Sequence, residues 1–336
     1  MIDYAQLSRR GQIRRLRRVA ENALTLYGIE PVSLSLLHHS FNTTFTVIGP
    51  GGARFVLHIL RPEVDPFSEL QSPSRVASEL WWLDRLRADI GLAVPVAVRT
   101  PTGEGVVSVA VEGVTPARLC TLFHWIDGRF VLHRLMPAHL EAVGTLTARL
   151  HRHSEHLRVP AGFDRPTVDA ADAETEEGVV RLFTDQFSLE SARVMQEVFR
   201  RVRRAKEELG SGPGTSGLIH ADIHQRNYLF RAGDVHLIDF GDCGWGHYLY
   251  DLAVTLSELE VSPRRAAQRA ALLAGYRRDR GLSPAHERLL DTFVMLREVQ
   301  NVTWFLRDQD NPSSPEQAAQ IGERVAALQR LLDAGA

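Results

Sequence analysis

The densest group of chemically useful side chains lies between Leu218 and Phe230. It contains His220, Asp222 and Asn227, with the aspartate five positions before the asparagine. This H-x-D-x-x-x-x-N spacing is typical of a loop in which the aspartate takes a hydroxyl proton and the asparagine holds magnesium. A loop, unlike a helix, can aim both groups at one point. The pattern therefore favours phosphoryl transfer to a hydroxyl.

A second motif follows twelve residues after Asn227, where an apolar run leads into Asp239-Phe240-Gly241. A D-F-G triplet after a strand is the metal-binding element that accompanies such a loop. Magnesium prefers carboxylate or amide oxygens together with substrate phosphates. Each motif alone arises easily by chance, but the ordered set is much more specific. The two motifs together indicate a magnesium-dependent site.

Zinc chemistry is the main rival interpretation. His220, Asp222 and His224 alternate along the chain, and Asp239 could be a further ligand of zinc in a hydrolase. That reading leaves Asn227 and the strand-rich first part of the chain without roles. We therefore favour phosphoryl transfer.

The periodicity of the chain changes near residue 125. An amphipathic helix is expected at residues 7–27, and strands alternate with one helix up to residue 124. The expected strands are 32–36, 44–48, 54–59, 94–98, 106–111 and 117–123, with a helix at 74–87. The later part is mainly helical, with two short strand-like segments at 228–230 and 236–239. Its expected helices are 138–153, 189–209, 248–259, 263–278, 284–307 and 315–332.

Composition limits the partners. A net charge of -2 gives no reason to expect nucleic-acid or acidic-membrane binding. Cys120 and Cys243 are too few for a disulfide framework, and no apolar run approaches a membrane-spanning length. We expect a cytoplasmic protein that binds neither nucleic acid nor membrane.

The segment from His220 to Ala253 resembles the aminoglycoside phosphotransferase and choline kinase superfamily, which shares its architecture with protein kinases. Residues 55–62, 79–83, 91–95 and 122–128 resemble successive parts of its first lobe and hinge. The resemblance implies an α+β, two-lobed protein-kinase-like fold, with an antiparallel sheet plus helix in the N-lobe and a mainly helical C-lobe. The expected divisions are an amphipathic helix at 1–30, a nucleotide-binding N-lobe at 31–124 and a catalytic, acceptor-binding C-lobe at 125–336.

The resemblance also implies roles for five residues. Asp222 would be the catalytic base or hydroxyl positioner, and Asn227 and Asp239 the magnesium ligands. His220 would brace the loop. Asp251 would support the loop from behind, from the start of the next helix.

The nucleotide site is implied in the same way. Ser40, Asn42 and Thr43 occupy the place of the loop over the nucleotide phosphates, although this loop lacks glycine. Backbone groups near Phe123 and Trp125 would receive the adenine ring.

The chain departs from the family pattern at the phosphate-binding lysine. Kinases of this architecture usually carry that lysine on the third strand, paired with a helix glutamate. The matching position is His58, and Glu79 is the candidate partner. Lys206 is the only lysine and lies in the helix before the catalytic loop, so it cannot substitute. Arg61 could supply the permanent charge.

The expected activity is ATP- and Mg²⁺-dependent transfer of the gamma-phosphoryl group to a hydroxyl of a small metabolite. Homoserine-, choline-, sugar-amine- and aminoglycoside-like acceptors remain open, as does oligomeric state. A protein serine/threonine kinase and a nucleotide-binding pseudokinase are the alternatives.

Residues outside the two motifs carry weaker signals. Arg297, Trp304 and Phe305, on a late helix, are candidates for an acceptor pocket, with core packing favoured for the two aromatic residues. His151 and His153 point to different faces of a predicted helix, so solvated positions are favoured over a metal pair.

Overall fold

The computed structural model describes residues 4–40, 42–61, 72–171, 173–259, 262–307 and 315–333. The chain divides into two compact units. Unit 1 comprises residues 1–129, 159–166 and 236–241, and unit 2 comprises residues 130–158, 167–235 and 242–336. Phe41, in the predicted phosphate loop, lies outside the described residues.

Unit 1 is built on a five-stranded antiparallel sheet with strand order β1-β2-β3-β5-β4. Its strands are β1 (Ser33–His39), β2 (Thr43–Ile48), β3 (Arg54–Ile59), β4 (Val106–Val111) and β5 (Val114–His124). Alternation along β2 and β3 turns every second side chain into the core, as in a sheet with one covered face. The central strand β3 carries His58 opposite Thr44 and Thr121.

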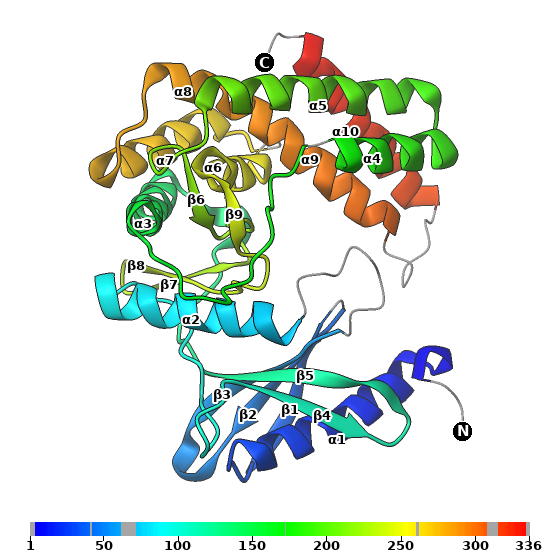
Figure 1. Ribbon diagram of the computed structural model, residues 1–336, viewed down its shortest axis with the longest axis vertical. Coiled ribbons are helices and arrows are strands. Elements are labelled where there is room, and N and C mark those ends of the chain that lie inside the picture. Colours follow the sequence, from blue (N-terminus) through cyan, green and yellow to red (C-terminus); the bar gives the residue numbers. More distant parts are fainter. Residues whose placement is uncertain are drawn as a thin grey trace. The chain divides into compact units, whose positions relative to one another are not determined.

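The helix α1 (Arg9–Leu26) covers one face of this sheet (Figure 1). Its buried stripe of Leu16, Val19, Ala20, Ala23 and Leu24 belongs to the same core as the inward-facing residues of the strands. Its arginines Arg10, Arg14, Arg17 and Arg18 are exposed on the other side of the helix. The amphipathic pattern of α1 is therefore explained by its packing against the sheet of unit 1.

A second helix, α2 (Pro73–Ile90), begins after the N-cap Ser72 and ends at Gly91, which has a φ of 59°. A left-handed residue at this position ends a helix with little strain when it is glycine. The Trp82 ring of α2 packs edge-on against Phe240 at 5.4 Å. This contact anchors the segment that carries Asp239 within unit 1.

Unit 2 is mainly helical. Its helices are α3 (Pro137–Glu155), α4 (Ala173–Gln186), α5 (Leu189–Leu209), α6 (Tyr248–Ser257), α7 (Arg265–Asp279), α8 (Pro284–Arg288), α9 (Leu290–Arg307) and α10 (Pro315–Asp333). Two short strands, β6 (Ser216–Ile219) and β9 (Gly244–His247), pair antiparallel. A hairpin of β7 (Tyr228–Arg231) and β8 (Asp234–Leu237) follows the catalytic loop. The catalytic loop therefore leaves β6 and enters β7.

Two glycines set the approach of α3 and α7. A Cβ atom on Gly144 would lie 2.0 Å from the Leu272 carbonyl oxygen, and one on Gly275 would lie 2.0 Å from the Glu141 carbonyl oxygen. Real Cβ atoms do not approach backbone oxygen so closely. Glycine at both positions therefore permits the two helices to touch backbone to backbone.

The expected α+β class, with an antiparallel first part and a mainly helical second part, is confirmed. The predicted helix at 284–307 is divided at Leu289 into α8 and α9, and the predicted strand at 94–98 is reduced to an isolated bridge at Ala97. The helix α4 and the two short strands β6 and β9 were not predicted. Strands of four residues have too little sequence for a periodic signal. The division at residues 30 and 124 stays a prediction.

Among the helices that the structure describes, none combines the length and the apolar character that crossing a bilayer requires.

Candidate active site

The catalytic loop brings Asp222, His224 and Asn227 into direct contact within unit 2. Asn227 Nδ2 donates to Asp222 Oδ2 at 2.8 Å and to the Asp222 carbonyl oxygen at 3.0 Å. His224 Nε2 lies 3.1 Å from the same Oδ2. Because the amide nitrogen of Asn227 faces Asp222, its amide oxygen is turned away. An outward amide oxygen is a donor atom that suits magnesium, so Asn227 fits the role of ligand.

The other oxygen of Asp222 is held by an arginine from α9. Arg297 Nη2 donates to Asp222 Oδ1 at 2.5 Å, and both side chains are largely buried. Burial by itself would raise the pKa of Asp222, but the hydrogen bond from His224 and the charge of Arg297 outweigh it. The pKa of Asp222 therefore lies well below its ordinary value, and the group is a carboxylate.

Arg297 is itself fixed by a chain of polar contacts. Burial acts against its charge, but Tyr250 and Asp222 hold the pKa of the guanidinium above its ordinary value. Arg297 also donates a hydrogen bond to the Tyr250 hydroxyl oxygen. Tyr250 donates to Gln300 Oε1, and Gln300 Nε2 donates to the Val168 carbonyl oxygen at 3.0 Å. The guanidinium is thus a rigid, permanent cation beside Asp222.

Asp251, on α6, holds the backbone of the loop. Its Oδ1 accepts from the Ala221 amide at 2.6 Å, and its Oδ2 accepts from the His220 amide at 3.0 Å. Ala221 has a φ of 67°, a left-handed conformation that is strained for a residue with a Cβ atom. Asp251 thus stabilises the strained turn that presents Asp222. The His220 side chain accepts from the Asp222 amide at 3.2 Å, which places it within the loop.

A buried relay of Arg280, Tyr276, His151 and Asp251 lies behind the loop. His151 Nε2 lies 3.0 Å from Asp251 Oδ2, its Nδ1 lies 2.9 Å from the Tyr276 hydroxyl, and Arg280 Nη1 donates to that hydroxyl at 2.9 Å. Burial lowers the pKa of His151 despite its hydrogen bond to Asp251, so the ring is neutral. Arg280 has no hydrogen-bond acceptor, so the Tyr276 hydroxyl must accept from Arg280 and give its own hydrogen to His151. Tyr276 donates to His151, and His151 donates to Asp251.

The predicted nucleotide-binding residues all lie in unit 1. His58 is at the centre of the sheet, with its ring 5.4 Å from that of Phe123. Burial lowers the pKa of His58, and Asp239 opposes this shift only in part. The imidazole is therefore neutral near pH 7. Asp239 follows β8 with a φ of 63°, a strained position that keeps its carboxylate close enough to His58 to act on it.

The predicted phosphate loop joins β1 to β2. Asn42 Oδ1 accepts from the Arg61 amide at 2.9 Å, which ties the loop to the end of β3. Ser40 Oγ lies 2.7 Å from His38 Nε2, and the Thr43 hydroxyl lies 2.7 Å from His39 Nδ1. Side-chain hydrogen bonds order this turn in place of the usual glycine pattern.

The two remaining predicted nucleotide contacts are Trp125, which follows β5, and Glu79, on α2. The backbone amide of Trp125 donates to the Arg54 carbonyl oxygen at 3.0 Å, and the Arg54 guanidinium stacks 4.2 Å from the Trp125 ring. This amide is therefore already hydrogen-bonded, which leaves backbone carbonyl oxygens and the amides that follow Trp125 for an adenine ring.

Glu79 is half-buried on α2. The assignments of Phe123, Trp125 and Glu79 to nucleotide binding stay predictions.

No group of three or more His, Cys, Asp or Glu side chains able to hold a metal occurs in the part of the chain that the structure describes. The alternating His220, Asp222 and His224 do not form such a group, because the two histidines serve backbone and carboxylate contacts within the loop. The zinc hydrolase interpretation therefore lacks its donor set among the described residues.

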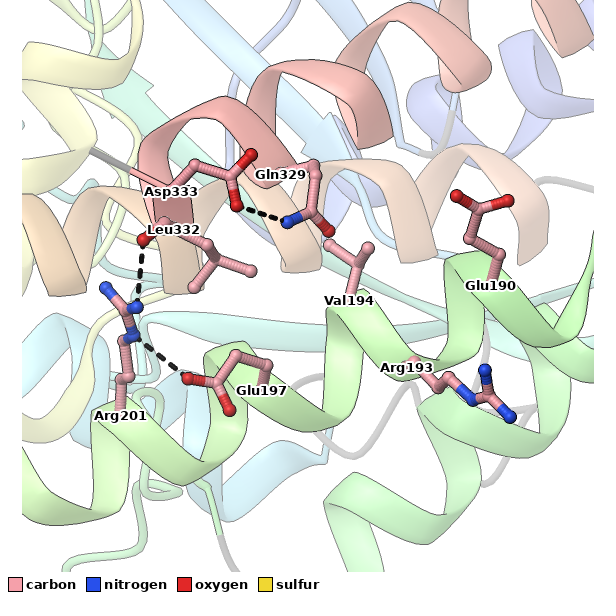
Figure 2. Close-up of a pocket in the computed structure, with 8 residues that line it drawn as sticks. All are labelled: Glu190, Arg193, Val194, Glu197, Arg201, Gln329, Leu332 and Asp333. Atoms are coloured by element: carbon pink, nitrogen blue, oxygen red, sulfur yellow. Dashed lines mark hydrogen bonds and ion pairs between the residues drawn. The ribbon is translucent and has the colours of Figure 1, made fainter. Parts of the chain in front are cut away.

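A surface pocket of about 350 Å³ lies between α5 and α10 in unit 2 (Figure 2). Its lining residues are Glu190, Arg193, Val194, Glu197, Arg201, Gln329, Leu332 and Asp333. Arg201 donates to the Leu332 carbonyl oxygen at 2.9 Å and to Glu197 at 3.1 Å, so the polar groups of the pocket bond one another. None of the predicted site residues lines it.

The structure corrects three sequence-based predictions about residues of unit 2. His151 is fully buried, not solvated, because it completes the relay to Asp251. Trp304 and Phe305 are 50% and 37% exposed, so the favoured core packing was wrong for both. Arg297 was proposed only as a pocket residue, whereas it donates a hydrogen bond to Asp222 directly. Its place on the buried face of α9, among apolar neighbours, was the available signal.

Comparison with known proteins identifies the family and similar structures. The sequence model of the phosphotransferase enzyme family matches residues 36–290. Among curated proteins no match was found. The structure of a microcompartment-associated aminopropanol kinase is 30% identical, with a TM-score of 0.79 over 95% of this chain and 98% of that one.

More distant structures share the fold. An amicoumacin kinase solved with AMP-PNP and Ca²⁺ is 20% identical, with a TM-score of 0.76 over 96% of each chain. A choline/ethanolamine kinase family protein from Mesorhizobium loti is 16% identical, with a TM-score of 0.61 over 94% of this chain and 95% of that one. Since the family model spans most of the chain, this chain belongs to the phosphotransferase enzyme family, and it has a kinase-like fold.

Proposed function

We propose that this protein is an ATP- and Mg²⁺-dependent kinase that transfers the gamma-phosphoryl group to a hydroxyl of a small metabolite. The observation that carries the proposal is Asp222, an ionised carboxylate fixed in a strained loop and hydrogen-bonded to Asn227. The family match and the small-molecule kinases among similar structures support this choice over a protein acceptor.

Asp222 is suited to orient a hydroxyl more than to remove its proton early. A carboxylate whose pKa is depressed is a weak base. Phosphoryl transfer proceeds through a loose transition state that needs little early deprotonation of the nucleophile. Asp222 would hold the acceptor oxygen in line and take its proton as the new bond forms.

The donor chemistry of Asn227 and Asp239 suits a magnesium ion. Bound there, it would neutralise charge on the nucleotide phosphates. Asn227 contributes the amide oxygen turned away from Asp222. Asp239 contributes a carboxylate from a backbone position that is strained, as is common for functional residues.

The test is an ATP-consumption screen over hydroxyl metabolites, with generic protein substrates alongside. Asp222→Asn keeps the size of the side chain and removes its charge. We expect turnover with at least one small acceptor and a loss of more than about a hundredfold in the variant, since the residue acts directly on the acceptor. Turnover that persists in Asp222→Asn, or that requires a protein acceptor, would contradict the proposal.

A nucleotide-binding protein without turnover is the second candidate, and the neutral His58 favours it. The third strand carries no lysine, and a neutral imidazole at His58 adds no charge toward phosphate. Clear binding of ATP and Mg²⁺ in a thermal-shift measurement, with no turnover across the screen, would support this candidate instead.

A further inference from the structure

We propose that the acceptor of this kinase carries a carboxylate close to the hydroxyl that is phosphorylated, and that Arg297 binds this carboxylate. The proposal rests on the proposed kinase function and narrows its acceptor to small hydroxy acids and hydroxy amino acids. Every residue that carries it lies within unit 2.

The first step is the lone-pair count of Asp222. A carboxylate oxygen accepts about two hydrogen bonds. Oδ2 already has Asn227 at 2.8 Å and His224 at 3.1 Å, whereas Oδ1 has only Arg297 among the described residues. An acceptor hydroxyl therefore reaches Asp222 at Oδ1, the oxygen that Arg297 holds.

The second step is distance. A hydroxyl hydrogen-bonded to Oδ1 lies about 2.7 Å from it. With Arg297 Nη2 at 2.5 Å from the same oxygen, the hydroxyl oxygen falls within roughly 5 Å of the guanidinium. A charged group three or four bonds from that hydroxyl oxygen is therefore able to reach Arg297.

The third step is the chemistry of the guanidinium. Arg297 uses one donor on Asp222 and one on Tyr250, out of the five that a guanidinium has. Its planar fork matches a carboxylate, and it repels an ammonium group. Because Tyr250 and Gln300 fix its position, the cation does not withdraw from the site at low cost.

The remaining charges of the site make Arg297 decisive. Asp222 and Asp242 both act electrostatically on Arg297, so both carboxylates lie near it. His224, whose pKa the hydrogen bond to Asp222 raises, is the other cationic group beside this carboxylate, and it lies against Oδ2. Without the guanidinium, the two acids therefore outweigh one imidazole, and the site would repel an anionic acceptor and attract a cationic one. A single neutral substitution is therefore expected to reverse the preference of the site for acceptor charge.

The experiment uses two pairs of compounds that differ in charge and little else. 3-Hydroxybutyrate and 1-amino-2-propanol share a skeleton and differ in a carboxylate or an ammonium group, and homoserine differs from 3-aminopropan-1-ol only by its carboxylate. For the wild-type protein with ATP and Mg²⁺, we expect kcat/KM to favour the carboxylate-bearing member of a pair by at least about tenfold. Equilibrium binding of the same compounds is measured in parallel, so the preference is tested even where turnover is slow.

The variant Arg297→Met removes the charge and keeps an unbranched side chain. We expect the ratio of kcat/KM between pair members to fall by at least about a hundredfold and to favour the amine. Arg297→Lys should retain the sign of the preference with a higher KM, because it keeps charge without the fork. Arg269→Met, which removes an arginine that bonds Asp291 elsewhere in unit 2, should leave the ratio unchanged.

A wild-type preference for the amines would overturn the proposal. An equal loss of kcat/KM for both pair members in Arg297→Met would also overturn it, because Arg297 would then only position Asp222. Absence of turnover with every hydroxyl compound would contradict the proposed function, while the binding preference would still decide the role of Arg297.

Discussion

Replacing His151 with asparagine tests whether the buried relay sets the geometry of the catalytic loop. His151 is fully buried and donates to Asp251, which in turn holds the amides of His220 and Ala221. Asparagine is too short to reach both Asp251 and Tyr276 from the same position on α3. The substitution therefore removes one donor from a buried carboxylate and leaves the Tyr276 hydroxyl without its acceptor.

Two magnitudes follow from these contacts. A hydrogen bond to a buried charged group contributes about 1.5–3 kcal/mol, so the free energy of unfolding should fall by about that amount. The left-handed turn at Ala221 stores roughly 1–3 kcal/mol of strain that Asp251 offsets. If Asp251, without its hydrogen bond from His151, no longer holds the turn, the loop leaves the strained conformation that presents Asp222. The fraction of molecules with Asp222 in place, and with it kcat, should then drop by about tenfold or more.

Three measurements separate positioning from general damage. Urea denaturation gives the loss of stability, and steady-state kinetics should show lower kcat with an unchanged KM for ATP. Hydrogen exchange at the amides of His220 and Ala221 should accelerate, since both bonds to Asp251 weaken. His156→Asn, at an exposed position just beyond the same helix, is the control and should change none of these.

The relay also predicts a pH dependence with a definite sign. The folded-state pKa of His151 is lowered, so below about pH 6.5 the unfolded chain binds more protons than the folded one. Stability is then fully present above that pH and is lost as the pH falls. His151→Asn should show a smaller difference in stability between pH 5 and pH 7.5 than the wild type. Unchanged loop exchange, unchanged kcat and an unchanged pH difference in His151→Asn would refute the reasoning.

Three further predictions concern other parts of the chain. Asp222 has a depressed pKa, so it stabilises the fold above about pH 4 and less as the pH falls; urea denaturation of Asp222→Asn should therefore show a weaker dependence on acid than the wild type. Gly144→Ala should cost roughly 1–3 kcal/mol by overpacking against α7, whereas Gly322→Ala, in open space on α10, should stabilise by about 0.5–1 kcal/mol, and equal thermal shifts would contradict this. Arg61→Ala should weaken ATP binding more than His58→Ala, because only the arginine is charged; unchanged affinity in both variants would show that the proposed phosphate contacts are wrong.

The sequence alone determined the parts of this protein that depend on local order. The spacing of Asp222 and Asn227 in one loop and the alternation of β2 and β3 follow from neighbours along the chain, so they were readable before the structure. The glycines at positions 144 and 275 gave no such signal. Glycine is required there because α3 and α7, which are distant in sequence, approach each other closely. Periodicity also gave the wrong burial for Trp304 and Phe305. A periodic pattern shows which residues share a face of a helix, but it does not show which face other elements cover.

Only the tertiary structure decided which charges meet. Arg297 lies 75 residues beyond Asp222, and His151 lies 100 residues before Asp251, yet each pair is in hydrogen-bond contact. No spacing rule connects such positions, because the packing of α3, α6, α7 and α9 brings them together. That packing fixes the charge of Asp222, the neutrality of His151 and the cation beside Asp222. The sequence thus indicated phosphoryl transfer, and the folded structure supplied the electrostatics that bear on the choice of acceptor.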